Sequence, residues 1–199
     1  MPRSIILASG SDIRQALLTQ AHVPFEVVVP RIDEESIKMA LLEEGASPRD
    51  ISDALAEHKA LKISKKYPDS MVIGCDQILE HRGTILSKPE SVEMARNQLA
   101  MLRGNRHRLH SAAVICHQAS PIWRHVGQAQ LEMRTFSDAY LDAYIGRNWD
   151  SIRHAVGAYK LEEEGVRLFS RIDGDYFSIL GLPLLNILAY LGTSGELET

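Results

Sequence analysis

The chain has 199 residues, of which 45% are hydrophobic and 24% are charged. This is the composition of a globular protein that buries a substantial core in one or at most two domains. The formal net charge of -4 excludes a whole-protein positive field that would attract nucleic acid or a membrane, so any polyanion must be bound locally.

Strand-like and helical segments alternate along the chain, which predicts the α/β class. Strands are expected at residues 4–8, 25–29, 71–79, 109–117, 126–136 and 166–172. Helices are expected at residues 12–21, 52–66, 91–102, 137–144 and 182–191. Ser52 and Ser137 are expected to cap two helices, and residues 79–85 to form a hairpin. We expect one domain over residues 1–199, with two lobes around a cleft as an open alternative and residues 193–199 as a flexible tail.

Small hydroxyl residues stand where the first strand turns into the first helix. Ser9 and Ser11 lie in this turn, and Arg14 follows in the first turn of the helix. Backbone N–H groups at a helix start, two hydroxyls and a guanidinium together indicate a phosphate cradle. The alternative is that Ser11 only caps the helix while Arg14 is a solvated surface charge.

Carboxylates follow one expected core strand and interrupt another. Residues 33–35 read Asp-Glu-Glu after the second strand, where a hard cation would find oxygen ligands, although an acidic surface loop would have the same sequence. Asp76 interrupts the apolar run of residues 72–79. A buried carboxylate is costly unless it is paired, bound to a metal or used in chemistry, so Asp76 indicates function, with binding to backbone amides as the alternative.

Other charged residues give weaker signals. Lys59 lies on an apolar helix and Lys88 precedes a proline, so each can bind an anion or extend to water. Lys160 and Glu162 share one side if their segment is a strand, and either faces a ligand or lies in a solvated loop. The basic run of residues 103–110 lacks interleaved aromatic residues and is interpreted as a turn and a strand start. Nucleic acid and membranes are therefore not expected as partners.

Cys75 and Cys116 lie inside apolar runs, where two buried thiols are favoured over a disulfide framework or a metal site. The eight histidines lack the spacing of a zinc site. There is also no apolar run long enough for a signal-peptide core or a membrane span. We therefore expect a protein of the cytoplasm.

Taken together, the motifs resemble those of the Maf-like nucleoside triphosphate pyrophosphatases over nearly the whole chain. The resemblance rests on ASGSDIRQALL, the acid pair after Pro30, LAEHKA, IGCDQ, LSKPES, GAYKLEEEG and GDYFSILGLPLL. It implies an elongated α/β fold with a mixed twisted sheet, flanking helices and a central cleft, in a protein that is often a homodimer. It also implies cleavage of a nucleoside triphosphate to a nucleoside monophosphate and pyrophosphate with a divalent metal such as Mg²⁺ or Mn²⁺.

The resemblance implies roles for individual residues. Arg14, Lys59 and Lys88 would bind phosphates, together with the hydroxyl groups of Ser9 and Ser11 in the turn. Asp76 would be the catalytic proton acceptor. Glu34 and Asp76 would lie at the metal.

Base specificity is divided between two patterns. Gln77, Lys160 and Glu162 resemble the branch that acts on 7-methyl-GTP, and the Glu162 carboxylate can accept from the N1–H and amino groups of guanine. Ile13 departs from both branches, because the pyrimidine branch has arginine there and the 7-methyl-GTP branch has tryptophan. Ile13 offers neither a stacking surface nor a guanidinium.

Two functions other than nucleotide hydrolysis are also considered. A nucleotide-binding regulator of cell division or septation, without turnover, is suggested by the departures at Asp12, Ile13 and His154. Nucleic-acid binding through residues 103–110 is ranked last.

Overall fold

A computed structural model describes residues 3–198 of the chain, which form one α/β domain around a seven-stranded mixed sheet. The strand order is β2-β1-β3-β5-β6-β7, with β4 beside β3. β1 runs parallel to β2 and β3, whereas β3 pairs antiparallel with β4 and β5, and β6 pairs antiparallel with β5 and β7. The strands are β1 (Ile5–Ala8), β2 (Glu26–Val27), β3 (Met71–His81), β4 (Thr84–Leu86), β5 (Arg106–His117), β6 (Ser120–Met133) and β7 (Phe169–Asp173).

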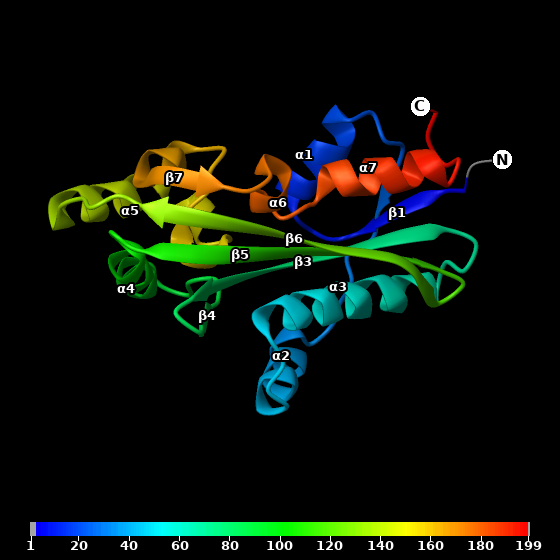
Figure 1. Cartoon of the computed structure of the whole chain (residues 1–199), viewed down its shortest axis with the longest axis horizontal. Coiled ribbons are helices and arrows are strands. Elements are labelled where there is room, and N and C mark those ends of the chain that lie inside the picture. The colour runs from blue at the N-terminus through cyan, green and yellow to red at the C-terminus, as the bar shows by residue number, and fades with distance from the viewer. Residues whose placement is uncertain (1–2, 199) are drawn as a thin grey trace.

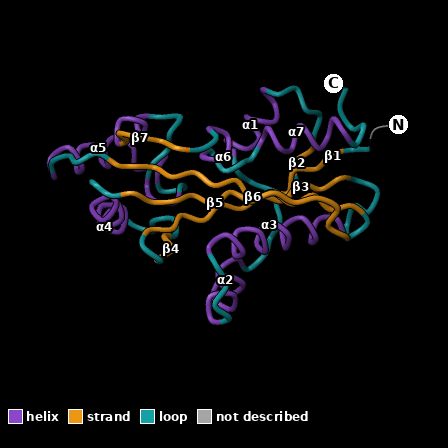
Figure 2. Tube along the Cα trace, viewed as in Figure 1, coloured by secondary structure: helices purple, strands orange, loops and turns teal. Residues whose placement is uncertain are grey.

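Helices cover both sides of the sheet. They are α1 (Asp12–Gln20), α2 (Glu34–Glu43), α3 (Pro48–Ser64), α4 (Val92–Leu102), α5 (Asp138–Ile152), α6 (Tyr176–Ile179) and α7 (Leu184–Thr193), with short 3₁₀ turns η1 (Val156–Ala158) and η2 (Glu164–Leu168). Figure 1 shows α3 on one side of the sheet and α1, α6 and α7 on the other, while α4, α5 and β7 lie at one end. The long strands β3, β5 and β6 run along the molecule, so the fold is elongated (Figure 2). The expected α/β class and mixed sheet are confirmed.

Alternate residues of β3 enter different cores. Ile73 and Cys75 belong to the large core that also contains Leu17 of α1. Val72 belongs to a second core with Ala56 of α3. Because side chains alternate along a strand, Asp76 points to the α3 side of the sheet and Gln77 to the opposite side.

The sheet is interrupted beside the middle of β3. β1 ends at Ala8, which is opposite Gly74, and β4 pairs with β3 only from Leu79 onward. Residues 75–78 of β3 therefore have no strand neighbour on this side, in a sheet whose other side they join to β5. This break in the strand pairing, which we call the β3 gap, includes Asp76.

Several element boundaries differ from those expected. The helix α2 is missing from the expected elements, and α3 begins at Pro48 instead of residue 52, because Ser47 accepts from the Asp50 N–H and Pro48 suits the first helical position. Ser52 caps nothing; it is buried inside the helix, and its hydroxyl donates to the Arg49 carbonyl. Ser137 does cap α5, which extends to Ile152.

The hairpin, the two cysteines and the end of the chain are also the subject of expectations from the sequence. The hairpin is present, with Arg82 and Gly83 at positive φ between β3 and β4. Cys75 and Cys116 are buried free thiols, as expected. Glu196, within the segment expected to be a flexible tail, is buried and forms an ion pair with Arg3 at 2.7 Å. Within residues 3–198, no helix is both long and apolar enough to cross a bilayer.

Candidate active site

Asp76, Lys59 and Glu34 form a line of ion pairs beside the β3 gap. The Lys59 ammonium donates to Asp76 Oδ1 at 2.7 Å and lies 3.0 Å from Glu34 Oε2. The side chains of Asp76 and Lys59 are each 8% exposed, whereas that of Glu34 is 53% exposed. Removing one partner of such a buried pair leaves the other charge uncompensated, which costs about 3–5 kcal/mol. The line therefore runs from the interior of the sheet to solvent.

The charge state of Asp76 depends on opposing effects. Burial raises the pKa of the Asp76 carboxyl above its ordinary value, and the Lys59 ammonium and Arg14 guanidinium offset part of that rise. A carboxylate with a raised pKa is a stronger base than an exposed aspartate. Asp76 therefore combines proximity to cations with the basicity that suits a proton acceptor.

Arg14 contacts the β3 gap at Cys75, near the end of β1. Its Nη1 donates to the Cys75 carbonyl at 3.1 Å and to Ser9 Oγ at 3.3 Å, and its Nε donates to the Gly181 carbonyl at 2.7 Å. The guanidinium has further N–H donors that remain for an anion. Arg14 is thus fixed by backbone carbonyls from two distant segments, and it is not the solvated surface charge of the alternative interpretation.

The serines of the turn take different positions. Ser9 is buried, and its hydroxyl also accepts from the Ser11 N–H at 3.2 Å. Ser11 stands at the N-cap of α1, but its side chain makes no capping hydrogen bond. The alternative in which Ser11 only caps the helix is therefore wrong.

Lys88 follows β4 and is exposed. Because β4 runs antiparallel to β3 and pairs Leu86 with Leu79, the chain beyond Leu86 runs back along β3 toward Asp76. The backbone at Lys88 therefore lies at the β4 end of the β3 gap, whereas Arg14 contacts Cys75 at the β1 end. Its ammonium makes no ion pair with the residues that the structure describes.

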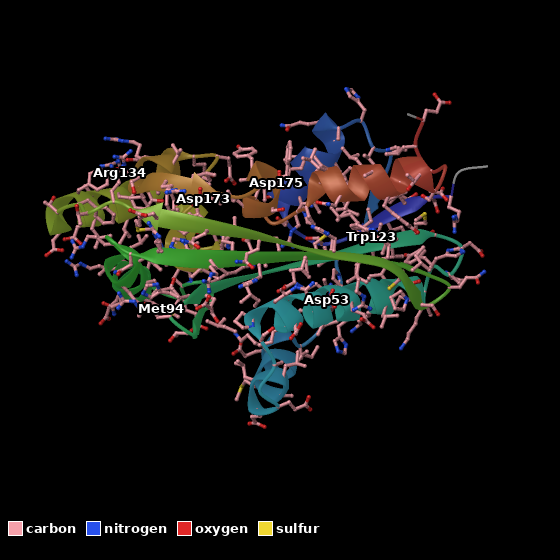
Figure 3. All side chains as sticks on the ribbon, in the orientation of Figure 1. Asp53, Met94, Trp123, Arg134, Asp173 and Asp175 are labelled. Carbon is pink, nitrogen blue, oxygen red and sulfur yellow. The ribbon has the colours of Figure 1, made fainter. Side chains whose placement is uncertain are left out.

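Gln77 lies on the other side of the sheet from Asp76. Its Nε2 donates to Ser111 Oγ and to the carbonyls of Ser178 and Ile179, at 2.9, 3.2 and 2.9 Å. These bonds connect β3 to α6, whose first turn is capped by Asp175. Figure 3 shows Asp175 near α6 and Asp53 on α3, on opposite sides of the sheet.

The remaining specificity candidates are less closely connected. Ile13 is partly buried against the large core, so its side chain contributes to packing. Glu162 is exposed in a turn, and the neighbouring Lys160 pairs with Glu163 at 3.2 Å. The strand that would place Lys160 and Glu162 on one side does not form; the chain turns there between η1 and η2.

The sequence interpretation missed two features of the site. One is α2, which carries Glu34 and Lys38 on one face and has both expected signals, since Asp33 caps its start and Gly45 at φ 78° follows its end. The other is Gly181, which has a positive φ and whose carbonyl accepts a hydrogen bond from Arg14. No local pattern connects Gly181 with Arg14, because they are distant in sequence.

A family model described as "Maf-like protein" matches residues 4–194. The chain belongs to the Maf-like protein family. A relative from Ruegeria sp. (strain TM1040) named "Nucleoside triphosphate pyrophosphatase" is 61% identical to this Maf-like protein over 198 residues, covering 100% of both chains. A relative of the same name from Caulobacter vibrioides is 50% identical, covering 97% of this chain and 96% of its own. A relative from Brucella abortus biovar 1 named "7-methyl-GTP pyrophosphatase" is 44% identical, covering 96% of each.

Proposed function

We infer that this Maf-like protein is a nucleoside triphosphate pyrophosphatase, which hydrolyses its substrate to a nucleoside monophosphate and pyrophosphate. The observation that carries this conclusion is the pairing of buried Asp76 with Lys59 and Glu34 beside the β3 gap. Arg14 contacts that gap at Cys75. The full-length identity of 61% to a relative of that name supports the same reaction.

The chemistry follows from these residues. Water attacks the α phosphorus, the bond from that phosphorus to the bridging oxygen breaks, and pyrophosphate leaves with the electron pair. We assign Asp76 to accept the proton of the attacking water. Arg14, Lys59 and Lys88 would bind the phosphate oxygens and stabilise the charge that develops on the leaving pyrophosphate. Ser9 and Ser11 would add donors at the start of α1.

A divalent metal belongs to this proposal. Within residues 3–198 there is no cluster of three or more histidine, cysteine or acidic side chains, but Glu34 and Asp76 offer carboxylate oxygens on either side of Lys59. This donor set suits Mg²⁺ or Mn²⁺, because Mg²⁺ is commonly held by one or two carboxylates together with substrate phosphates and water. When bound, such an ion neutralises charge on phosphate oxygens.

A more specific part of the proposal concerns which nucleobase the substrate carries. The motif residues Gln77 and Glu162 match the 7-methyl-GTP branch, in agreement with the name of the Brucella relative, whereas Ile13 matches neither branch. Because the Gln77 amide nitrogen bonds within the fold, Glu162 is the residue of this pair that is left to contact the base. We propose 7-methyl-GTP as one substrate to be tested against unmodified nucleotides. We also propose that the protein is a homodimer in the cytoplasm. Sedimentation analysis tests the oligomeric state.

The decisive experiment measures pyrophosphate release from UTP, dTTP, CTP, GTP and 7-methyl-GTP, with Mg²⁺ and with Mn²⁺. Wild type and Asp76→Asn are compared, with nucleotide affinity measured in parallel. We expect release by wild type, and loss of release but not of binding in Asp76→Asn. A preference for 7-methyl-GTP would mean that Gln77 and Glu162 outweigh Ile13.

Two results would overturn parts of this proposal. Saturable nucleotide binding without release from any nucleotide would favour the regulator of cell division or septation instead. Unchanged turnover in Asp76→Asn would remove Asp76 from its role as proton acceptor while leaving the enzyme class intact.

A further inference from the structure

Lys38 is a lysine that none of the sequence motifs includes. It lies on α2 one helical turn after Glu34, so both side chains project from one face of the helix. Its side chain is only 13% exposed, although α2 has no fully buried residue and projects from the α3 side of the molecule (Figure 1). Lysine ammonium groups normally extend to water. A specific contact therefore holds Lys38 in place.

That contact joins α2 to the segment after β4. Lys38 Nζ donates to Ser87 Oγ at 2.8 Å and lies 2.6 Å from Glu35 Oε2. The Ser87 carbonyl in turn accepts from Gln98 Nε2 of α4 at 2.8 Å, and Gln98 is buried. Ser87 is thus held through its side chain by α2 and through its backbone by α4.

These contacts complete a ring around one side of the β3 gap. Asp76 of β3 pairs with Lys59, and Lys59 pairs with Glu34. One turn of α2 leads from Glu34 to Lys38, whose ammonium reaches Ser87. The chain then returns to β3 through the pairing of β4 with β3. Lys88, the neighbour of Ser87, lies on this ring.

We propose that Lys38 is a positioning residue of the active site, whose ammonium fixes the segment 87–88 to α2 so that Lys88 and Glu34 face the same bound triphosphate. The inference rests on the proposed pyrophosphatase function. The physical reason is preorganisation: an exposed lysine on an unanchored segment must be ordered when the substrate binds, and that ordering weakens binding. Asp76 and Lys59 keep their own contacts without Lys38, so the chemical step is preserved.

The test compares Lys38→Gln, Ser87→Ala and the double variant with wild type, using the nucleotide of highest kcat/KM. We expect each single variant to raise KM about tenfold, the contribution of one charge-assisted hydrogen bond, with kcat within about twofold of wild type. The double variant is expected to match a single one, because both changes remove the same contact. Lys38→Arg should retain most of the wild-type KM.

Two measurements do not depend on turnover. The Kd for inorganic pyrophosphate in the presence of Mn²⁺ should rise in Lys38→Gln, and amide hydrogen exchange in residues 87–90 should become faster. The matched control is Lys65→Gln, which removes the same charge from an exposed residue just after α3 and should change neither.

Distinct results would overturn the inference. In an active wild type, an unchanged KM in Lys38→Gln excludes a positioning role, and additive effects of Lys38→Gln and Ser87→Ala show that Lys38 does not act through Ser87. Absence of pyrophosphate release by wild type would instead defeat the proposed function. In that case an unaltered Kd for pyrophosphate and unaltered exchange in Lys38→Gln would reject the role of Lys38 as well.

Discussion

Gly74 of β3 lies directly against the backbone of Ala56 in α3. A Cβ atom at Gly74 would stand 2.2 Å from the Ala56 carbonyl oxygen and 2.6 Å from the Ala60 nitrogen, both of which are rigid helix backbone. The absent side chain lets α3 approach the sheet closely. Asp76 follows two residues later on the same side of β3, and Lys59 belongs to the same helix, so this close approach sets the distance between them.

The variant Gly74→Ala should therefore damage both stability and turnover. Displacing α3 should lower the free energy of unfolding by about 1–3 kcal/mol, as overpacking does. Moving Lys59 by about 1 Å relative to Asp76 should lower kcat/KM by about 100-fold. Urea unfolding and pyrophosphate release measure the two effects.

Gly146→Ala is the control for this variant. Gly146 lies inside α5, where a Cβ atom would meet no neighbour within 4 Å, so alanine there should leave turnover unchanged and stabilise the helix slightly. Normal kcat/KM in Gly74→Ala would show that the approach of α3 does not set the geometry of the site.

Arg14→Lys should weaken substrate binding. The guanidinium binds the carbonyls of Gly181 and Cys75 at the same time, and a single ammonium cannot reach both while also facing a phosphate. We expect KM to rise about tenfold, the loss of one charge-assisted hydrogen bond. Steady-state kinetics compare it with Arg108→Lys, a change at an exposed residue of β5, and equal KM values in the two variants would contradict the prediction.

Gln77→Glu should destabilise the fold. The Nε2 donor of Gln77 would be replaced by an oxygen facing the carbonyls of Ser178 and Ile179, so acceptors would meet acceptors. An unsatisfied buried group costs about 1–3 kcal/mol, and we expect a loss of this size in the free energy of unfolding. Gln128→Glu, at an exposed position of β6, is the control in urea unfolding, and equal stability of the two variants would refute the prediction.

The parts of the site that are encoded locally can be predicted from the sequence. Asp76 is predictable because a charge in an apolar run must be compensated, and the structure supplies Lys59 at 2.7 Å. The turn with Ser9 and Arg14 is predictable because strand, turn and helix are adjacent in the chain. The α/β class followed from the alternation of elements.

The rest depends on contacts between distant segments. Nothing near Arg14 in the sequence indicates that its Nε binds Gly181, and nothing near Lys38 indicates Ser87. Residues 33–35 form an acidic run in the sequence, and the cap at Asp33 predicts the helix α2 only in combination with the stop at Gly45. The sequence motif associates Gln77 with the base, whereas its amide nitrogen is used within the fold.

His107 should make the stability of the protein depend on pH. It is buried in β5 with Nε2 2.8 Å from the Tyr159 hydroxyl, while its Nδ1 has no hydrogen-bond partner among the described residues. Burial, with a smaller contribution from His81, lowers the pKa of His107 from 6.5 to about 4. The unfolded state therefore binds a proton more readily than the folded state between these two values.

The sign of the effect follows from that difference. Above pH 6.5 the His107 side chain is neutral in both states and has no effect, and stability falls as the pH decreases from 6.5 through about 4. The shift corresponds to roughly 3 kcal/mol. Urea unfolding at pH 7 and pH 4.5 should show a smaller loss on acidification for His107→Gln than for wild type, even though the substitution itself lowers stability at pH 7. His154→Gln, at an exposed histidine, should keep the wild-type difference, and an undiminished loss in His107→Gln would show that other groups cause the pH dependence.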